Sequence, residues 1–317
     1  MEKALAIQKQ VIEILGRDEV YLVGGSVRDL VMGNTPKDYD FTTPMLPDDM
    51  EARVSAAGRR VYGIGKKFGT IGFKVPVGVT IEAKDDGSAG SDYPEYETVT
   101  HYEYVEVTTF RSEVYTSKSR KPEVQFVPSL EEDLARRDFT MNAMVLRPDG
   151  TIYDPYGGKL HIHKKHIVTV GMPKDRIQED PLRMLRAARF AARYGFSIDP
   201  NFIGKARQLA DRIYDVSVER WVQELDKLLT SHYMDNGITE LFQMGLLERI
   251  LPEFMSAGDL IRGIGEEVTD DPDQMWRLAL QGVDENRRTA RYINSGICAR
   301  LKFSNDRRDL ILDNRKK

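Results

Sequence analysis

The chain has 317 residues, with 46 Lys and Arg against 50 Asp and Glu, which gives a formal net charge of −4. This length is typical of two or three domains, and 41% hydrophobic with 30% charged residues excludes a disordered or membrane-embedded chain. The single cysteine, Cys298, excludes an intramolecular disulfide framework and a multi-cysteine zinc site. No stretch reaches the roughly 18 apolar residues of a membrane span, and the N-terminus lacks a signal-peptide core, so the cytoplasm is the expected location.

The first half of the chain predicts a mixed α/β domain. After an N-terminal helical pattern, a helix at 26–33 is expected to end at Gly33. Residues 85–97 contain five acids, two glycines and no Lys or Arg, which predicts an exposed loop. Strands are expected at 20–25, 38–43, 59–65, 69–76 and 101–111.

Helices dominate the second half. Ser129 and Glu132 have the spacing of a capping box at the start of a helix, and residues 148–150 predict a hairpin turn. Further helices are expected at 180–194, 201–213, 217–230, 236–249, 274–281 and 286–301. The order is therefore α/β followed by all-helical.

A glycine pair separates the first expected strand from the helix that follows it. Glycines such as Gly24 and Gly25 let a phosphate approach the backbone, and the free amides at a helix start attract an anion. Glycines between a strand and a helix are nevertheless more often plain turn geometry. The dinucleotide fingerprint GxGxxG is absent, because Arg28 and Asp29 occupy the stretch of its third glycine.

Two aspartates open the second expected strand. Asp38 and Asp40 are two residues apart, so on a strand both project from one face, roughly 6.5–7 Å apart at the backbone. Carboxylates placed in this way can converge on a hard cation such as Mg²⁺. A turn or a cap usually explains an isolated Asp-x-Asp, but a neighbouring phosphate-binding turn would favour metal-dependent phosphoryl transfer.

A third carboxylate could come from the last strand of this half. Glu103, Glu106 and Glu113 are all available there. For each of them an ordinary surface acid is the more common explanation, and the sequence alone does not identify which of the three would be catalytic.

The helix expected at 180–194 has the most informative charge pattern. Asp180 as N-cap, Pro181 at the first helical position and Gly195 at the end define its limits. Its four arginines share an arc of about 120°, opposite an apolar face. They are Arg183, Arg186, Arg189 and Arg193.

No acid lies between Pro181 and Gly195 to screen these arginines from one another. A solvated surface is the simplest explanation of most charge runs, but this face favours an anion or a planar hydrogen-bonding edge such as a nucleobase. The Asp180 carboxylate could accept and the Arg183 guanidinium could donate hydrogen bonds, and together they could recognise the edge of a nucleobase.

Three other charged segments are less specific. Arg136, Arg137 and Asp138, with Asn142 close behind, could be a salt-bridged helix end or part of a site. The segment 284–317 has ten Lys or Arg against five acids, which suggests a polyanionic partner despite the acidic total. An alternating exposed strand explains three histidines better than a zinc site does, namely His161, His163 and His166.

Four motifs in this order and spacing resemble class II CCA-adding tRNA nucleotidyltransferases and the related bacterial poly(A) polymerases. They are YLVGGSVRDLVMGNTPKDYDFTT, VEVTTFR, EEDLARRDFTMNAM and RIQEDPLRMLRAARFAARYGF. The resemblance covers roughly residues 18–230, and weaker similarity continues through GLLERILPEF and RLKFSND.

The resemblance implies an α/β palm of the DNA polymerase beta nucleotidyltransferase type, followed by all-α neck and body domains. The implied division is a catalytic head at 1–145, a neck at 146–235 that contains the helix 180–194, and an RNA-binding body at 236–317. The chain ends soon after RLKFSND, so we expect a shortened body in which the tail that grips the tRNA elbow is short or absent. The acidic segment 85–97 has no counterpart, and the His-Asp phosphohydrolase module of some members is missing.

The resemblance also implies roles for individual residues. Asp38 and Asp40 would hold two Mg²⁺ ions, with Glu106 as the third catalytic carboxylate. Asp180 and Arg183 match the pair that templates the incoming base. The other implied nucleotide-binding residues are Gly24, Gly25 and Arg28 at the triphosphate, Arg137, Asp138 and Asn142 at ribose and phosphates, and Arg186 and Arg189 beside the base-reading pair.

The implied reaction is attack of a tRNA 3′ hydroxyl on the α-phosphate of CTP or ATP, with loss of pyrophosphate. A poly(A) polymerase, or an enzyme that adds only A or only C, is a near alternative, although residues 65–70 resemble the CCA-type flexible loop more closely. A non-catalytic RNA-binding protein is a further alternative, which the full set of carboxylates disfavours.

Overall fold

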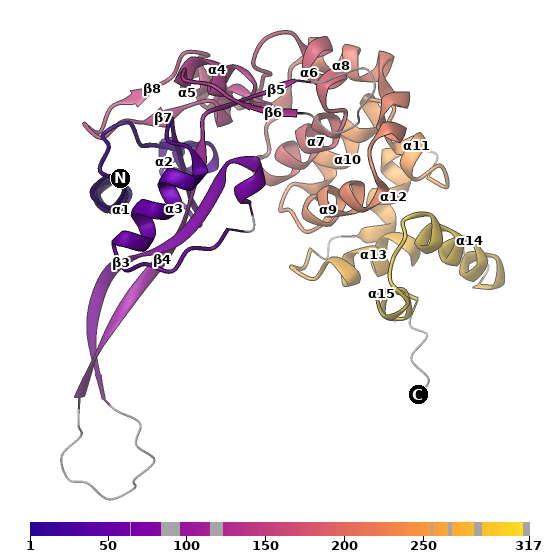
Figure 1. Ribbon diagram of the computed structural model, residues 1–317. Coiled ribbons are helices and arrows are strands. Elements are labelled where there is room, and N and C mark those ends of the chain that lie inside the picture. The colour runs from indigo at the N-terminus through magenta and orange to yellow at the C-terminus, as the bar shows by residue number, and fades with distance from the viewer. Residues whose placement is uncertain are drawn as a thin grey trace, which may run out of the picture. The chain divides into compact units, whose positions relative to one another are not determined.

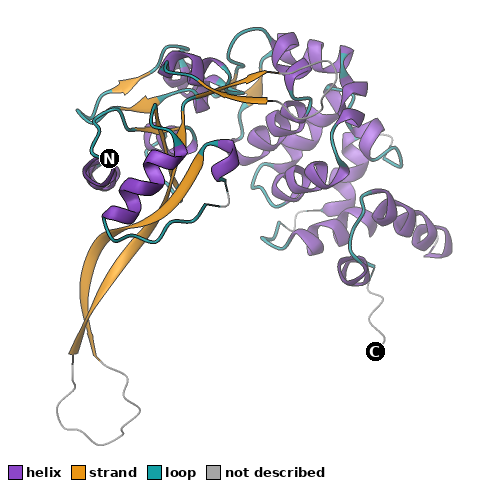
Figure 2. Ribbon diagram, in the orientation of Figure 1, coloured by secondary structure: helices purple, strands orange, loops and turns teal. Residues whose placement is uncertain are grey.

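The structure is a computed structural model that describes residues 1–63, 65–83, 96–114, 123–254, 256–265, 268–281 and 287–312. The chain divides into two compact units: Met1–Arg137 with Met141–Lys159, and Asp138–Thr140 with Leu160–Lys317. The first unit mixes helices and strands, whereas the second is almost entirely helical (Figure 2). The expected order of an α/β region followed by a helical region is confirmed.

A six-stranded sheet forms the centre of the first unit, in the order β3-β4-β2-β1-β7-β8 (Figure 1). Neighbouring strands are antiparallel except β2 and β4, which are parallel. In chain order the strands are β1 (Tyr21–Val23), β2 (Tyr39–Thr43), β3 (Thr70–Ala83), β4 (Tyr96–Thr109), β7 (Val145–Leu146) and β8 (Ile152–Tyr153). A separate hairpin pairs β5 (Arg111–Val114) with β6 (Glu123–Phe126).

The helices of the first unit bury one face of the sheet. Helix α1 (Glu2–Leu15) packs on β3 and on α3 (Pro47–Ala56), and α3 also contacts β3. Side chains on the covered face, such as Phe73 and Val105, are fully buried because residues alternate between the two faces of a strand. The opposite face is covered in part, where Val23 packs with Leu134 and Val145; the rest of this face, which we call the open face, carries polar groups. The remaining helices are α2 (Gly25–Val31), η1 (Lys66–Phe68) and α4 (Leu130–Ala135).

The β3–β4 hairpin is longer than the sequence pattern suggested. Its pairing continues from Thr70↔Thr108 to Ala83↔Tyr96, with a bulge between Pro76 and Gly78. The expected strand 69–76 therefore ended too early, and the expected strand 101–111 began too late and ran past the end of β4 at Thr109. Tyr96 and Glu97, expected in the loop 85–97, belong to β4, and the rest of that loop lies outside the described residues.

The strand expected at 59–65 is reduced to one bridge in the described residues, between Tyr62 and Gly72.

Helix α7 (Leu182–Tyr194) lies at the centre of the second unit, between α9 (Val218–Leu229) and α10 (Met234–Gln243). A Cβ at Gly237 of α10 would come within 2.6 Å of the Cβ of Ala192, so the glycine permits this close helix contact. The other elements are η2 (Thr140–Asn142), α5 (Gly158–His163), β9 (His166–Ile167), α6 (Pro173–Glu179), β10 (Ser197–Ile198), α8 (Pro200–Gln208), η3 (Ala210–Asp215), α11 (Leu247–Ile250), α12 (Ala257–Ile264), α13 (Pro272–Gln281), α14 (Arg287–Arg300) and α15 (Asn305–Ile311).

Several local predictions hold. The Ser129 hydroxyl accepts a hydrogen bond from the Glu132 amide at the start of α4, and β7 and β8 form the expected hairpin around Gly150. Gly195 ends α7 in the left-handed conformation, with φ of 65°. The helix expected at 236–249 is instead broken in two by Gly245, which has φ of 70°.

The histidine segment is the expected strand only at His166, which opens β9. Residues Gly158–His163 form helix α5, because the Asp154 carboxylate accepts hydrogen bonds from the amides of Gly158 (2.7 Å) and Lys159 (2.9 Å) and so satisfies the first donors of the helix.

Within the described residues, no helix combines the length and the apolar character that crossing a bilayer requires.

Candidate active site

Two carboxylates face each other on neighbouring strands of the first unit. Asp40 on β2 and Glu106 on β4 are register partners across the parallel pair, so their side chains share the open face of the sheet. Asp38 stands two residues before Asp40 and is exposed. Glu103 points to the opposite face and forms an ion pair with Lys3 at 2.6 Å, and the side chain of Glu113 lies outside the described set. Of the three candidate glutamates, Glu106 is thus the one brought to Asp40.

Asp40 is a largely buried carboxylate with two other acids nearby. Burial, followed by the charges of Glu106 and Asp38, raises the pKa of Asp40 to about 6, while Arg137 opposes the shift. The Tyr104 hydroxyl donates a hydrogen bond to Glu106 Oε1 at 3.3 Å. Carboxylates crowded in this way attract a cation, and their oxygen atoms suit Mg²⁺.

In the described part of the chain, no group of three or more His, Cys, Asp or Glu side chains is close enough to hold a metal ion. A metal held by one or two of these carboxylates would therefore take its remaining ligands from water or substrate phosphates, as Mg²⁺ usually does. His161 instead makes a 2.9 Å hydrogen bond with the Thr140 hydroxyl, which leaves the zinc explanation without support.

The glycine pair makes room for two guanidinium groups. Gly24 has φ of 71°, and a Cβ there would come within 3.1 Å of Arg137 Nη1. A Cβ at Gly25 would come within 3.2 Å of Arg28 Nη2. Ser26 then ties the turn to β2, since its hydroxyl donates to the Asp38 carbonyl and accepts from the Asp40 amide. The turn therefore lies against two guanidinium groups, of which that of Arg137 also acts on the charge of Asp40.

Arg28 is held in a buried network. It donates from Nε and Nη2 to Asp29 Oδ1, at 3.0 and 2.8 Å, and from Nη1 to Asn142 Oδ1 at 2.7 Å. Two motifs far apart in the sequence thus meet in the first unit.

Asp133 anchors the following arginines. Its fully buried carboxylate forms ion pairs with Arg136 at 2.7 Å and Arg137 at 3.1 Å. Burial would raise the pKa of Asp133, but the two guanidinium groups outweigh it and lower the pKa. The salt-bridged helix end considered for this segment is therefore present, and it fixes the orientation of Arg137.

In the second unit, Asp138 faces Arg186. The Arg186 guanidinium donates from Nε (2.9 Å) and Nη2 (2.6 Å) to Asp138 Oδ2. The neighbouring Phe139 packs edge-on against Phe190, with ring centroids 5.7 Å apart, and so holds this segment on α7.

The arginines of α7 are not the unscreened basic face that the sequence suggested. Acids from other elements pair with them: Glu179 with Arg183 at 2.6 Å, and Glu224 on α9 with Arg189. Arg183 and Arg189 are only 6% and 8% exposed. Of the four arginines, Arg193 is the exposed one.

Asp180 and Arg183 each have another partner. The Asp180 carboxylate accepts from the Leu182 amide at 3.1 Å and from Arg220 at 2.9 Å. Helix α7 begins at Leu182, one residue later than expected, with Pro181 at its cap.

The sequence patterns did not identify Glu224 or Asp133 as functional candidates, although each forms an ion pair with a candidate arginine. A signal existed for Glu224, because it lies one turn from the apolar residues Trp221 and Leu228 on its helix, where an unpaired acid would be unfavourable. Asp133 carries no such signal, since it follows two other acids in an ordinary helical stretch.

Comparisons with known proteins agree with this architecture. A sequence family described as "Poly A polymerase head domain" matches residues 20–168, and one described as "Probable RNA and SrmB- binding site of polymerase A" matches residues 195–257. The CCA-adding enzyme of Bacillus subtilis is 40% identical over 253 residues, which are 80% of this chain and 56% of that protein. That of Geobacillus thermodenitrificans is 38% identical over 245 residues, 77% of this chain and 53% of that protein. The chain thus spans about half the length of the curated relatives it matches.

Solved structures show the same fold. The crystal structure of the Bacillus stearothermophilus CCA-adding enzyme in complex with CTP matches with a TM-score of 0.71 and 30% identity, over 97% of this chain and 67% of that one. A tRNA nucleotidyltransferase complexed with a primer tRNA and an incoming ATP analog matches in fold, with a TM-score of 0.66 and 22% identity, over 92% of this chain and 79% of that one. The chain belongs to the family of class II CCA-adding tRNA nucleotidyltransferases and bacterial poly(A) polymerases.

Proposed function

We propose that this chain adds C and A nucleotides from CTP and ATP to the 3′ end of tRNA, without a nucleic-acid template and with release of pyrophosphate. The observation that carries the proposal is the register pairing of Asp40 with Glu106 beside the turn that holds Arg28 and Arg137. The choice of tRNA, CTP and ATP rests on the CCA-adding relatives.

Nucleotidyltransferases of this family generally use divalent metal ions, and we propose Mg²⁺ held by Asp38 and Asp40, with Glu106 as the third carboxylate. When bound, Mg²⁺ offsets the charge of the triphosphate and lowers the pKa of the attacking hydroxyl. In the reaction the 3′ oxygen forms a bond to the α-phosphorus and the bond from that phosphorus to the pyrophosphate breaks. The hydroxyl proton is released to solvent.

Residues of the glycine turn are proposed to bind the triphosphate. Gly24 and Gly25 let the guanidinium groups of Arg28 and Arg137 approach the turn, where they would pair with phosphate oxygens. Asn142 contributes by holding Arg28. The hydrogen bonds of these arginines to Asp29, Asn142 and Asp133 keep their positions before the nucleotide arrives.

In the second unit, α7 is proposed to recognise the nucleotide. Asp180 and Arg183 would present an acceptor and a donor to the base edge of C or A, with Asp138, Arg186 and Arg189 as the surrounding binding residues. The ion pairs of Arg183 with Glu179 and of Arg189 with Glu224 restrict the rotamers of these side chains. A restricted donor discriminates between bases better than a mobile one.

We further propose the division into a catalytic head at 1–145, a neck at 146–235 and an RNA-binding body at 236–317. The match of the second sequence family to residues 195–257 supports an RNA-binding role near the neck and body. The cytoplasm is the proposed location, because tRNA and nucleoside triphosphates are the proposed substrates and the single cysteine is free.

A nucleotide-addition assay tests the function. Purified protein would be incubated with Mg²⁺, tRNA that lacks its terminal nucleotides, and each nucleotide singly and together, and the product lengths and sequences read. We expect two C residues from CTP, a single A from ATP after them, and then arrest. Long A tracts from ATP alone would identify a poly(A) polymerase instead, and addition of one nucleotide type only would identify an A-only or C-only enzyme. Protein with Asp40→Asn serves as the control for contaminating activity.

A further inference from the structure

Three tyrosines gather on the open face of the sheet, beside the carboxylates. Tyr102 and Tyr104 on β4 are 48% and 42% exposed, and Tyr62 is half-buried at the edge of β3. The rings of Tyr62 and Tyr104 meet edge to face, with centroids 5.7 Å apart. We call Tyr62, Tyr102 and Tyr104 the tyrosine cluster.

A single row of register partners joins this cluster to the carboxylates. Tyr62 bridges to Gly72, Gly72 pairs with Glu106, and Glu106 pairs with Asp40. Paired residues on neighbouring strands direct their side chains to the same face. The row therefore runs from the aromatic edge of the sheet directly to the two carboxylates.

Gly72 is the position in this row that has no side chain, and Tyr104 fills the space. A Cβ at Gly72 would come within 1.9 Å of the Tyr104 hydroxyl and 2.6 Å of its ring carbon Cζ. The ring thus leans across β3, and its hydroxyl donates to Glu106. Any larger residue at position 72 would displace the ring, so the position of the Tyr104 ring depends on the glycine.

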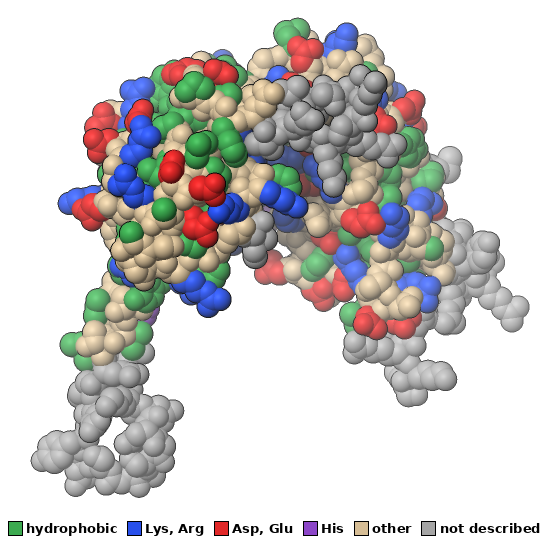
Figure 3. Space-filling view, viewed as in Figure 1, with side chains coloured by type: hydrophobic (Ala, Val, Ile, Leu, Met, Phe, Trp, Pro, Cys, Tyr) green, Lys and Arg blue, Asp and Glu red, His purple; other side chains and the backbone are tan. Residues whose placement is uncertain are grey.

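Positive charge accompanies the rings. The Arg60 guanidinium carbon lies 5.2 Å from the centroid of the Tyr62 ring, and Lys74, which is exposed, is the register partner of Tyr104. Farther out, the face of the described hairpin stem that Figure 3 shows carries mainly hydrophobic and uncharged side chains. Exposed aromatic rings interleaved with Arg and Lys are typical of surfaces that bind single-stranded nucleic acid.

The position of the tyrosine cluster in the sheet indicates which substrate it would bind. Across the sheet, the proposed triphosphate turn follows β1, the carboxylates lie on β2 and β4, and the tyrosines lie at β3 and β4. In-line displacement places the attacking oxygen opposite the departing pyrophosphate. If pyrophosphate leaves on the β1 side, the attacking 3′ hydroxyl approaches from the β3 side, where the tyrosines are.

We propose that the tyrosine cluster stacks a base at the single-stranded 3′ end of the RNA primer, while Arg60 and Lys74 contact its phosphates. This proposal rests on the proposed nucleotide addition, for which it names the primer-binding surface. Stacking is tolerant of sequence because every base has a π-face, which suits a site that must hold a primer ending successively in different bases.

The test uses the full chain and a single-stranded RNA with 2-aminopurine near its 3′ end, whose fluorescence falls when the base stacks. We expect the wild-type protein to quench the fluorescence in the absence of nucleoside triphosphate. Tyr104→Ala and Tyr62→Ala are expected to lose most of the quenching and to raise the KM for RNA about tenfold, with the KM for CTP unchanged. Tyr104→Phe, which keeps the ring, should behave as wild type in both measurements.

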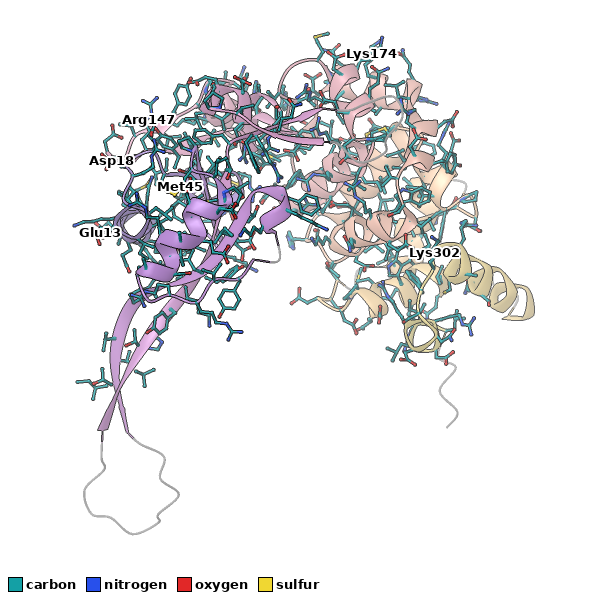
Figure 4. All side chains as sticks on the ribbon, in the orientation of Figure 1. Glu13, Asp18, Met45, Arg147, Lys174 and Lys302 are labelled. Carbon is teal, nitrogen blue, oxygen red and sulfur yellow. The ribbon has the colours of Figure 1, made fainter. Side chains whose placement is uncertain are left out.

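Tyr153→Ala is a matched control, because Tyr153 lies on β8 at the opposite edge of the same sheet. Its hydroxyl likewise donates to a glutamate, Glu131 at 3.2 Å, and its ring lies 4.6 Å from Arg147, which is labelled in Figure 4. This variant should quench as wild type does.

Two results would overturn the stacking site. One is unchanged quenching and RNA KM in Tyr104→Ala. The other is an equal loss in Tyr104→Phe, since the hydroxyl at Glu106 would then matter and not the ring. Failure of the wild-type protein to add any nucleotide, with quenching retained, would reject the proposed function and leave the RNA-stacking surface intact.

Discussion

Arg28 Nη1 donates a hydrogen bond to Oδ1 of Asn142, 114 residues away in the sequence, at 2.7 Å. Both side chains are buried, at 5% and 7% exposure. The glycine turn and the segment after Arg137 are therefore one structural feature, in which the amide of Asn142 holds the guanidinium in place beside Gly25.

Asn142→Ala should weaken triphosphate binding about tenfold and lower the free energy of unfolding by roughly 1–3 kcal/mol, because it leaves a buried charged donor without this acceptor. Calorimetric titration with CTP and thermal unfolding measure the two effects. Asn236→Ala is the control, since the partly buried side chain of Asn236 also donates hydrogen bonds, to the carbonyls of Ala191 and Phe196. It should lower stability without changing CTP affinity. If both variants affect CTP equally, the proposed role of the Arg28–Asn142 pair is wrong.

Asp40→Asn should reduce nucleotide incorporation by roughly a thousandfold or more, because it keeps the shape of the side chain but removes the charge that would hold Mg²⁺. RNA binding should persist. Chelation of divalent metal should abolish wild-type incorporation, and added Mg²⁺ should restore it. Glu103→Gln is the matched control, since Glu103 lies on the same strand as Glu106 but faces Lys3. Retained incorporation in Asp40→Asn would remove the metal assignment.

Arg183→Ala should impair the choice of base more than the binding of triphosphate. We expect discrimination of CTP and ATP against GTP and UTP to fall by about 10–100-fold, since a lost hydrogen-bond donor acts on base identity. Values of kcat/KM for all four nucleotides test this. Glu179→Gln should give a smaller change in the same direction, because Glu179 only positions Arg183. Arg193→Ala, on the same helix but exposed, should resemble wild type. An equal loss for all four nucleotides would contradict base reading.

Glu240→Gln should stabilise the protein, and more so as pH rises. Burial raises the pKa of Glu240 above its ordinary value of 4.5, and its Oε2 has no hydrogen-bond partner. A raised folded-state pKa means that the folded protein holds the proton more tightly. The contribution of Glu240 to stability is therefore present below its unfolded-state pKa and is lost as pH rises through the folded-state pKa.

Thermal unfolding of wild type and Glu240→Gln at about pH 5 and about pH 8 tests this linkage. The advantage of the variant should be larger at the higher pH. Glu13→Gln is the control, since Glu13 is exposed on α1 (Figure 4) and should change little at either pH. An advantage that is constant with pH would show that ionisation of Glu240 does not limit stability.

Local chemistry allowed much of the backbone to be predicted. The cap at Ser129, the hairpin at Gly150 and the end of α7 at Gly195 each depend on neighbouring residues, and all three were predicted. Prediction failed where a distant or unrecognised group decided the outcome. The Asp154 carboxylate starts helix α5 in a stretch whose alternation suggested a strand. The bridge from Tyr62 to Gly72 replaced a longer expected strand.

The sequence by itself determined the order of an α/β region and a helical region, the family, and the candidate carboxylates and arginines, because periodicity and motif spacing are written in neighbouring residues. Only the tertiary structure decided which groups meet. It selected Glu106 over Glu103 as the partner of Asp40, because strand alternation turns residues 103 and 106 to opposite faces. It also decided that Asp138 pairs with Arg186 and Glu224 with Arg189, although neither arginine has an acid close to it in the sequence. Such pairings arise when packing brings together residues tens of positions apart, and buried charges persist only where such a partner is present.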